Sequence, residues 1–263
     1  MKGKWMKPAI VLLLAAMLAI PLVTGCGGIS GQTLHPGKLT MGSDMFYPPF
    51  ETMEGTKAVG FDVDLAQAIA GKLGVTLDVI PTAWGEIVGG LKTKKYDIIM
   101  SAMTITPDRE KQINFSNPYI VSDQSLAVAS NSKIKSVADL KGKTVGVQIG
   151  TTGQSKAEEL QPTAGIKKIE KFDSILVAFE ALEQGKIDAI INDYPINMYI
   201  SGQRGKTKVV AQIKTNEQYG IGVRKDNTAL LASINKALKA VQDDGTYATI
   251  YKKWFGVAPP VSK

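Results

Sequence analysis

The sequence contains almost none of the side chains that build disulfides, transition-metal sites or histidine-dependent catalytic centres. Among its 263 residues there is one cysteine, Cys26, and one histidine, His35. A disulfide needs two cysteines, and structural zinc sites need several cysteine or histidine ligands. Serine and cysteine hydrolases need a histidine base, and His35 lies before the first predicted strand. These absences exclude a disulfide framework, a Cys/His metal site and a catalytic triad; no cofactor or metal is expected, and carboxylate chemistry stays open.

Charge of one sign is not concentrated anywhere in the chain. The formal net charge is +7, and Lys2, Lys4 and Lys7 precede an N-terminal apolar run, so the remainder carries 7 − 3 = +4. Without a basic block, nucleic-acid binding is not favoured. The composition is 44% hydrophobic, which is enough for one large or two small domains with cores of their own.

The N-terminus has the pattern of a secretory signal. Basic residues are followed by an apolar run from about residue 8 to 22, which is short for a membrane span. The run ends in Val23-Thr24-Gly25-Cys26, which resembles the lipobox of bacterial lipoproteins. That resemblance implies removal of residues 1–25 and lipidation of Cys26, with an ordinary signal peptide as the alternative. Residues 26–37 are rich in small and polar side chains and are expected to form a flexible tether.

Beyond the tether, strand and helix patterns alternate, which is typical of α/β folds with largely parallel sheets. The first part predicts strands at 38–42, 75–80 and 96–100, a loop at 43–50, a helix at 61–73 and a short helix at 86–92. The middle predicts strands at 126–129, 144–148 and 186–191 and helices at 136–140, 154–160 and 174–182. A crossing strand at 219–223 and two amphipathic helices, one ending at Gly245 and one that contains Trp254, complete the pattern.

Polar side chains follow several predicted strands at their carboxyl ends, where ligands bind in open α/β sheets. Ser101 and Thr104 come directly after the strand at 96–100, and Arg109 follows them. Arginine presents a planar fork of donors that matches a carboxylate. Alternatively, Arg109 is an exposed residue at a helix start. Asp44 and Trp84 follow other strands of the same sheet, which favours a ligand site at this edge.

The chain also repeats one pattern. The segments 91–101 and 182–192 each lead from a helix through a turn into an aspartate and an apolar strand with a polar end. Two similar lobes facing each other would bring Arg109 and Asp193 to one cleft. The loop Gly150-Thr151-Thr152-Gly153 opens a predicted helix, and such a loop serves either as an anion site or as a plain N-cap.

Taken together, these residues resemble the polar amino-acid family of extracellular solute-binding proteins, the receptors of ABC uptake systems. The similarity runs from about Lys38 to Gly256, and its motifs, specific in their order and spacing, are Asp44-x-x-Tyr47-x-Pro49-Phe50, Val59-Gly60-Phe61-Asp62-Val63-Asp64-Leu65, Ile105-Thr106-Pro107-Asp108-Arg109, Phe115-Ser116-Asn117-Pro118-Tyr119 and Gly245-Thr246-Tyr247 with Tyr251-Lys252-Lys253-Trp254-Phe255-Gly256. The resemblance implies an α/β, two-lobe, periplasmic-binding-protein-like fold of type II, with two hinge strands and lobes that close over a ligand.

The implied domains are a first lobe made of residues 38–127 and 218–257, an inserted second lobe at 128–217, and a tail at 258–263. Hinges are expected near residues 126–130 and 216–220. The implied partners are a free amino acid, the permease and ATPase subunits of an importer, and the membrane through Cys26. The protein is expected to be an extracytoplasmic monomer that is anchored to the outer face of the cell membrane or is periplasmic.

The resemblance also implies roles for individual residues. Arg109 holds the ligand carboxylate with help from Thr104 and Thr152, and Asp193 takes the α-ammonium. Tyr47 and Trp84 hold the ligand side chain, and Asp44 meets its polar end. The same wall includes Ser101, Ala102 (where some relatives have serine) and Gln148.

Charge counting favours a basic ligand, arginine, lysine or histidine. Arg109 and Asp193 neutralise the carboxylate and the ammonium of the ligand, so Asp44 has no charge partner. An unpaired carboxylate in a dry cleft is energetically costly. A lysine at position 148 would pair with Asp44, but the residue there is Gln148. The alternatives are a receptor for glutamine or another polar amino acid, a dehydratase-like enzyme on the same fold, and an amino-acid sensor lipoprotein. We expect a binding protein and not an enzyme.

Overall fold

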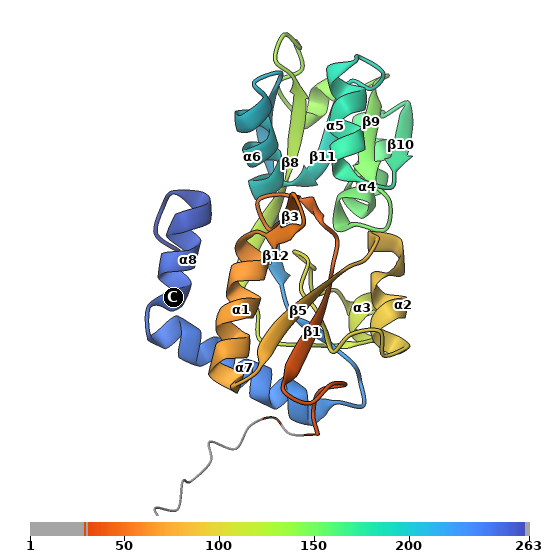
Figure 1. The fold of residues 1–263 in the computed structure, drawn as a ribbon. Coiled ribbons are helices and arrows are strands. Elements are labelled where there is room, and N and C mark those ends of the chain that lie inside the picture. Colours follow the sequence, from red (N-terminus) through yellow and green to blue (C-terminus); the bar gives the residue numbers. More distant parts are fainter. Residues whose placement is uncertain (1–28, 30, 261–263) are drawn as a thin grey trace, which may run out of the picture.

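The computed structural model describes residue 29 and residues 31–260, and it consists of two α/β lobes stacked end to end (Figure 1). The expected signal segment, Cys26 and the last three residues lie outside the described part of the chain. Each lobe has a five-stranded sheet flanked by helices. The two-lobe α/β fold inferred from the sequence is therefore confirmed.

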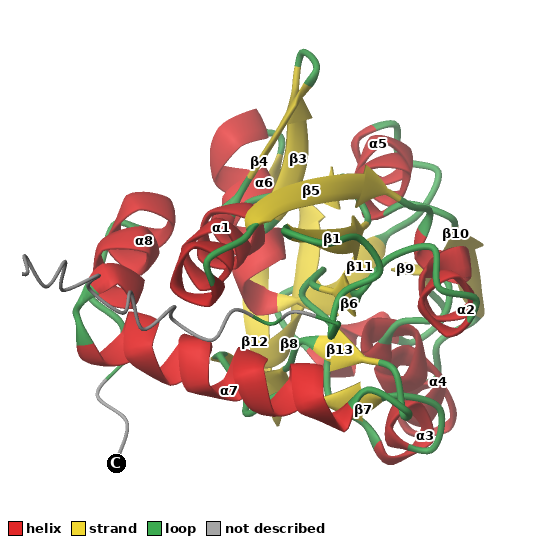
Figure 2. Cartoon of the chain, turned by 60° about the horizontal axis from the view of Figure 1, so that its bottom comes forward, coloured by secondary structure: helices red, strands yellow, loops and turns green. Residues whose placement is uncertain are grey.

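The first lobe contains the sheet with strand order β5 (Thr76–Pro81), β1 (Lys38–Ser43), β6 (Ile98–Ile99), β13 (Gly222–Val223) and β7 (Asn114–Phe115). Its helices are α1 (Phe61–Leu73), η1 (Trp84–Glu86), α2 (Ile87–Lys92), α3 (Pro107–Glu110), α7 (Thr228–Asp243) and α8 (Thr246–Phe255). A small antiparallel sheet of β2 (Phe46–Tyr47), β3 (Glu51–Glu54) and β4 (Lys57–Val59) also belongs to this lobe, and Figure 2 labels β3 and β4.

The second lobe contains the sheet with strand order β10 (Lys168–Phe172), β9 (Thr144–Gln148), β11 (Ala189–Asp193), β8 (Ile120–Ala129) and β12 (Thr207–Tyr219). Its helices are η2 (Val137–Leu140), α4 (Thr152–Ala164), α5 (Ile175–Glu183) and α6 (Tyr194–Arg204). In both lobes the sheet is mixed rather than mainly parallel. In the first, β1 pairs in parallel with β5 and β6, whereas β13 pairs antiparallel with β6 and β7. In the second, β9 pairs in parallel with β10 and β11, whereas β8 pairs antiparallel with β11 and β12.

The helix α1 forms where the sequence predicts it, and its residues show why. Leu65, Ile69 and Leu73 recur at helical spacing and are buried against the first sheet. The helix ends at Gly74, which adopts the left-handed conformation (φ 71°) that glycine adopts at least cost. Strand β9 likewise has the predicted bounds of 144–148. Most other predicted elements shift by a few residues, as for β11, which runs from 189 to 193 and so includes Asp193. The predicted crossing strand at 219–223 is wrong, because residues 222–223 form β13 inside the first sheet and the crossing is made by β12, which ends at Tyr219.

Strands β8 and β12 run alongside each other from the first lobe into the second sheet (Figure 1). The first crossing lies earlier than the expected boundary after residue 127, because residues 124–128 of β8 already pair with β11. The polar run at 122–125 interrupts the apolar pattern, so the sequence predicts a strand only from Leu126, whereas β8 begins at Ile120. The second expected boundary, after residue 217, falls inside β12, close to its end at Tyr219.

Two other parts of the fold differ from the sequence expectation. The expected loop at 43–50 includes the short strand β2, which pairs with β3 as Phe46↔Thr52 and Tyr47↔Glu51. The long strand β12 and the helix α6 carry no clear apolar period over their full length and were not predicted. Most of the core is continuous, however, since one buried cluster joins Phe50 and Tyr219 of the first lobe to Phe179 of the second.

Gly60, the residue before α1, provides a test of how tightly this helix is seated. Its φ is 143°, and a Cβ added there would lie 2.0 Å from the carbonyl oxygen of Phe50. We expect Gly60→Ala to lower the free energy of unfolding by about 2 to 4 kcal/mol, because both the backbone angle and the contact become unfavourable. Chemical denaturation measures the change.

The matched control for Gly60→Ala is Gly71→Ala in the same helix, where an added Cβ meets nothing within 4 Å. This alanine should raise the free energy of unfolding by about 0.5 to 1 kcal/mol through its better helix propensity. Similar effects of the two alanines would contradict the described packing of α1 against Phe50.

Candidate functional site

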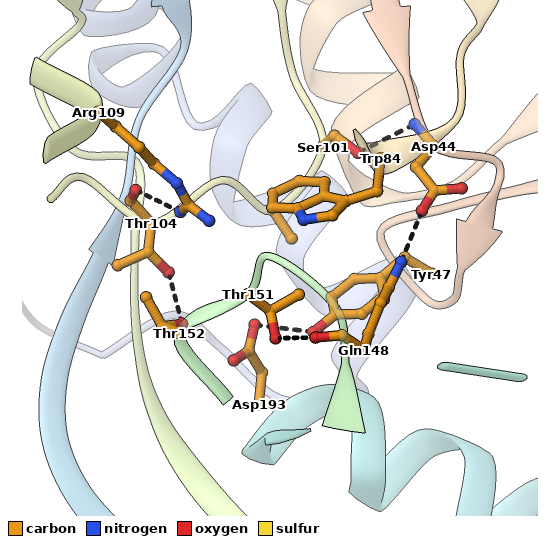
Figure 3. A pocket seen from close by; sticks show the side chains of 11 residues that line it. Asp44, Tyr47, Trp84, Ser101, Thr104, Arg109, Gln148, Thr151, Thr152 and Asp193 are labelled. Atoms are coloured by element: carbon orange, nitrogen blue, oxygen red, sulfur yellow. Dashed lines mark hydrogen bonds between the residues drawn. The ribbon is translucent and has the colours of Figure 1, made fainter. Parts of the chain in front are cut away.

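The lobes enclose one small pocket at the carboxyl ends of their central strands (Figure 3). The space among its lining atoms is about 290 Å³, a figure that includes solvent at its open side. All ten residues inferred from the sequence line it, and one that was not inferred, Thr151, joins them: Asp44, Tyr47, Trp84, Ser101, Ala102, Thr104, Arg109, Gln148, Thr151, Thr152 and Asp193.

The positions of these residues follow from the topology. Asp44 comes directly after β1, and Ser101 follows β6, its neighbour in the first sheet. From the second lobe, Gln148 ends β9 and Asp193 ends β11. Thr151 is the N-cap of α4, and its hydroxyl accepts from the backbone N–H of Gln154. The plain-cap interpretation of this loop is therefore correct for Thr151, while the adjacent Thr152 faces the pocket.

Arg109 reaches across the cleft between the lobes. Its Nη1 donates to the carbonyl of Thr104 at 2.7 Å, and its Nη2 donates to the carbonyl of Gly150 at 3.2 Å. Its guanidinium carbon also lies 5.1 Å from the ring centre of Trp84, a cation–π contact. Burial lowers the pKa of Arg109, whereas the nearby Asp193 and Glu217 raise it. Arg109 stays a cation and has further N–H donors for a guest carboxylate.

Asp193 lies buried at the opposite wall, among neutral donors. Its Oδ1 accepts from Gln124 Nε2, and its Oδ2 accepts from the hydroxyls of Tyr47 and Tyr219. Burial, together with the nearby charge of Glu217, raises the pKa of Asp193 to about 6, although the hydrogen bonds from Tyr219, Gln124 and Tyr47 act in the opposite direction. No cation pairs with Asp193 among the described ion pairs, so a guest ammonium would find it uncompensated.

Asp44 is also buried, at 4% exposure, and Gln148 is its neighbour from the other lobe. Gln148 Nε2 donates to Asp44 Oδ2 at 3.1 Å, so the carboxylate has a neutral partner that the charge count from the sequence did not assume. Burial raises the pKa of Asp44, while the hydrogen bond from Gln148 lowers it. An amide relieves part of the cost of desolvation but leaves the negative charge in place.

Glu217 and Gln124 are site residues that sequence reasoning missed. The carboxylate of Glu217 accepts from the hydroxyls of Thr104 at 2.9 Å and Thr152 at 2.6 Å, one from each lobe. Gln124 Nε2 donates to Glu217 Oε1 at 3.0 Å as well as to Asp193. Both residues lie on the crossing strands β12 and β8, where no motif marks them, so only the pairing of the strands reveals them.

The arrangement has an excess of acid. Asp44 and Asp193 line the pocket, Glu217 adjoins it, and Arg109 is the cation that lines it. A molecule with a carboxylate and two cationic groups would neutralise these charges better than a neutral guest, because desolvated like charges repel strongly. Among the described residues, no group of three or more His, Cys, Asp or Glu is placed to hold a metal ion. No helix in that part of the chain is long and apolar enough to cross a membrane.

Comparison with known sequences identifies the family. Residues 39–257 match the model of the bacterial extracellular solute-binding proteins, family 3. The chain belongs to this family. It is 37% identical to the arginine-binding extracellular protein ArtP of Bacillus subtilis over 254 residues, or 95% of this chain and 98% of ArtP. It is 36% identical to the ABC transporter arginine-binding protein 1 of Escherichia coli, over 83% of this chain and 90% of the relative.

Solved structures of this family agree with the two-lobe fold. An ancestral arginine-binding protein bound to arginine has a TM-score of 0.79 and 42% identity, covering 84% of this chain and 99% of its own. An ancestral arginine-binding protein bound to glutamine has the same TM-score and 41% identity, covering 85% of this chain and 100% of its own. These relatives are described as binding proteins rather than as enzymes.

The raised pKa of Asp193 predicts how stability depends on pH. The folded pKa of about 6 lies above the ordinary value of 3.8, so the contribution of Asp193 to stability is complete below about pH 4 and is lost as pH rises through 6. In the ligand-free protein this loss is about 3 kcal/mol, which Asp193→Asn should remove because the amide does not ionise. Denaturant unfolding of both proteins between pH 4 and 7 measures the difference, and parallel pH profiles would contradict it.

Proposed function

We propose that this protein is the substrate-binding component of an ABC importer for basic amino acids, with arginine as the preferred ligand. The observation that carries the proposal is the charge of the closed pocket, in which Asp44 and Asp193 face Arg109. The binding of arginine by the similar proteins supports the same choice. Lysine and histidine are the next candidates, since they share the α-amino acid group and a basic side chain.

In this proposal the pocket recognises the zwitterion at two places. Arg109 binds the α-carboxylate with its free donors, with the backbone and hydroxyl groups of Thr104 and Thr152 beside it. Asp193 accepts from the α-ammonium, and the tyrosine hydroxyls that already donate to it hold the carboxylate in place. The positive charge of the ligand thus offsets part of the repulsion between the buried carboxylates.

The ligand side chain extends between Tyr47 and Trp84 toward Asp44. A guanidinium there pairs with the Asp44 carboxylate, next to the Gln148 amide that contacts it now. The aromatic faces add apolar area and attract a cation. Ser101 and Ala102 form the adjoining wall, and the missing hydroxyl of Ala102 leaves room for the side chain.

Binding is coupled to closure of the lobes about the crossing strands. Contacts such as Asp44 with Gln148 and Arg109 with Gly150 join the lobes directly. A guest that bridges Arg109 and Asp193 adds to these contacts and favours the closed state that the permease would receive. We place the protein outside the cytoplasmic membrane as a monomer, held by lipid on Cys26 after removal of residues 1–25.

Two alternatives keep specific support. Glutamine would donate its amide to Asp44, and one similar solved structure is described with glutamine. A dehydratase-like enzyme would use a buried acid of raised pKa, such as Asp193, as its proton donor. We favour a receptor without enzymatic activity, because the three donors Gln124, Tyr47 and Tyr219 favour the charged form of Asp193, which suits it to bind an ammonium rather than to give up a proton. Recovery of unchanged ligand after prolonged incubation distinguishes receptor from enzyme.

The charge argument predicts that Asp44 sets the preference for basic ligands. Calorimetric titration of the wild type with arginine, lysine, histidine and glutamine should show tightest binding of arginine. Asp44→Asn should lower the affinity for arginine by about 10- to 100-fold and the affinity for glutamine far less, because only arginine forms an ion pair with the Asp44 carboxylate. Asp78→Asn, an exposed aspartate on β5, is the matched control. A wild type that prefers glutamine, or an unchanged arginine-to-glutamine ratio in Asp44→Asn, would refute the proposal.

The second prediction concerns the ligand carboxylate. Arg109→Ala should reduce the binding free energy of every amino acid in the panel by about 2 to 5 kcal/mol, since it removes the partner of the desolvated ligand carboxylate. Arg204→Ala, which removes an arginine paired with Glu183 away from the pocket, is the control and should bind as the wild type does. Affinity of Arg109→Ala within about threefold of the wild type would remove this residue from the site.

A further inference from the structure

Two carboxylic acids, Glu51 and Asp62, lie behind the pocket without lining it. Glu51 begins β3 and Asp62 lies in the first turn of α1, and both are completely buried. Neither residue takes part in any ion pair between described residues. Two ionised carboxylates without a cation would be very unfavourable in such a place, so the pair requires a proton.

Each acid holds one residue of the same turn in the pocket wall. Ser101 Oγ donates to Glu51 Oε1 at 2.7 Å, and the backbone N–H of Ala102 donates to Asp62 Oδ2 at 2.7 Å. Ala102 has a φ of 44°, a left-handed conformation that is unfavourable for alanine and needs support. Ser101 Oγ also accepts from the backbone N–H of Asp44 at 3.0 Å, so the two acids anchor Asp44 through this turn.

Each of the two acids has one carboxyl oxygen that these contacts do not use. These oxygens, Glu51 Oε2 and Asp62 Oδ1, are buried, and no N–H or O–H group of the described residues donates to them. Asp62 accepts from Ala102 and also from the Tyr119 hydroxyl at 2.9 Å, whereas Glu51 accepts from one serine. Asp62 is therefore the better-stabilised anion, and Glu51 is the residue that carries the proton.

The neighbouring titratable groups agree with this assignment. Burial raises the pKa of Glu51 well above its ordinary value, and the charges of Asp62 and Asp44 raise it further. Burial also raises the pKa of Asp62, while the hydrogen bonds from Ala102 and Tyr119 oppose that shift. The titratable groups that act on the pair or are acted on by it are Asp44, Tyr47, Tyr119 and Tyr247, none of which is a cation.

We propose that Glu51 and Asp62 form a proton-sharing carboxyl pair, in which protonated Glu51 donates from Oε2 to Asp62 Oδ1 and both residues position the Ser101–Ala102 turn and Asp44 for the ligand. They are positioning residues, since neither lines the pocket. The shared proton keeps one further negative charge out of an acidic site. The role toward the ligand rests on the proposed function, whereas the sharing of the proton does not.

A double-mutant cycle in the ligand-free full-length protein tests the pair. In Glu51→Gln the amide nitrogen replaces the protonated oxygen as donor to Asp62, and in Asp62→Asn the amide nitrogen donates to Glu51 in the reverse direction. Each single variant therefore keeps one donor and one acceptor. The double variant turns two N–H₂ groups toward each other with no acceptor, so its midpoint of thermal unfolding should fall at least about 3 °C below the sum of the single shifts.

Additive shifts in this cycle would overturn the shared proton, because two separately ionised or separately neutral acids would not depend on each other in this way. The matched control is Glu54→Gln, an exposed glutamate at the other end of β3, which should add to Asp62→Asn without coupling. The pH profile gives a second readout. Since the folded pKa of Glu51 lies above its unfolded value, its stabilisation is complete at low pH and is lost as pH rises. Glu51→Gln should lose less stability than the wild type between about pH 5 and 8, and an equal loss would contradict the proposal.

The positioning role is tested with arginine as the probe. Glu51→Ala removes the acceptor of the Ser101 hydroxyl, whereas Glu51→Gln retains one. Glu51→Ala should therefore lower the affinity for arginine at least tenfold more than Glu51→Gln does. Equal losses in the two variants would refute the positioning role. If the wild type itself does not bind arginine or another panel amino acid, the proposed function fails, while the unfolding cycle still decides whether the proton is shared.

Discussion

Asp44 and Asp193 come from different lobes and lie buried in one pocket, which Arg109 also lines. Placing like charges in a small, largely dry space is costly unless each carboxylate has donors, and the surrounding structure supplies them. Gln148 donates to Asp44, and Gln124 with two tyrosines donates to Asp193. These donors are neutral, so they satisfy hydrogen bonds without cancelling the charge. The site therefore retains a negative potential that a cationic guest relieves, which links its architecture to its selectivity.

The crossing strands β8 and β12 connect this electrostatic site to the motion of the lobes. Gln124 lies on β8 and Glu217 on β12, and the two side chains join the Asp193 wall to the threonines of both lobes. Asp123 of β8 also accepts from the backbone N–H groups of Thr215 and Asn216, where β12 departs from regular pairing. The pocket acid Asp193 and the strands that cross between the lobes therefore belong to one hydrogen-bonded network.

Motifs with a local cause were predictable from the sequence. The helix α1 has apolar residues at regular spacing and a glycine at its end, and strand β9 is a short apolar run, so their bounds follow from nearest neighbours in the chain. The polar residues after the strands pointed to a cleft, because strands of a parallel sheet end at a common edge. The first crossing was placed too late because the polar residues around Gln124, which serve the site, hide the start of β8. Functional side chains here disrupt the pattern that would otherwise reveal the strand.

Local periodicity in the sequence determined the α/β class, and the resemblance to the solute-binding family, carried by motifs in a characteristic order, implied the two-lobe plan and ten residues that line the pocket. Only the tertiary structure decided how the charges are compensated. Glu217, Gln124 and the buried pair of Glu51 and Asp62 lie far apart along the chain and match no motif with a known role. Their importance arises from burial and from contacts across strands and lobes. Such contacts depend on three-dimensional proximity, which no pattern of neighbouring residues encodes.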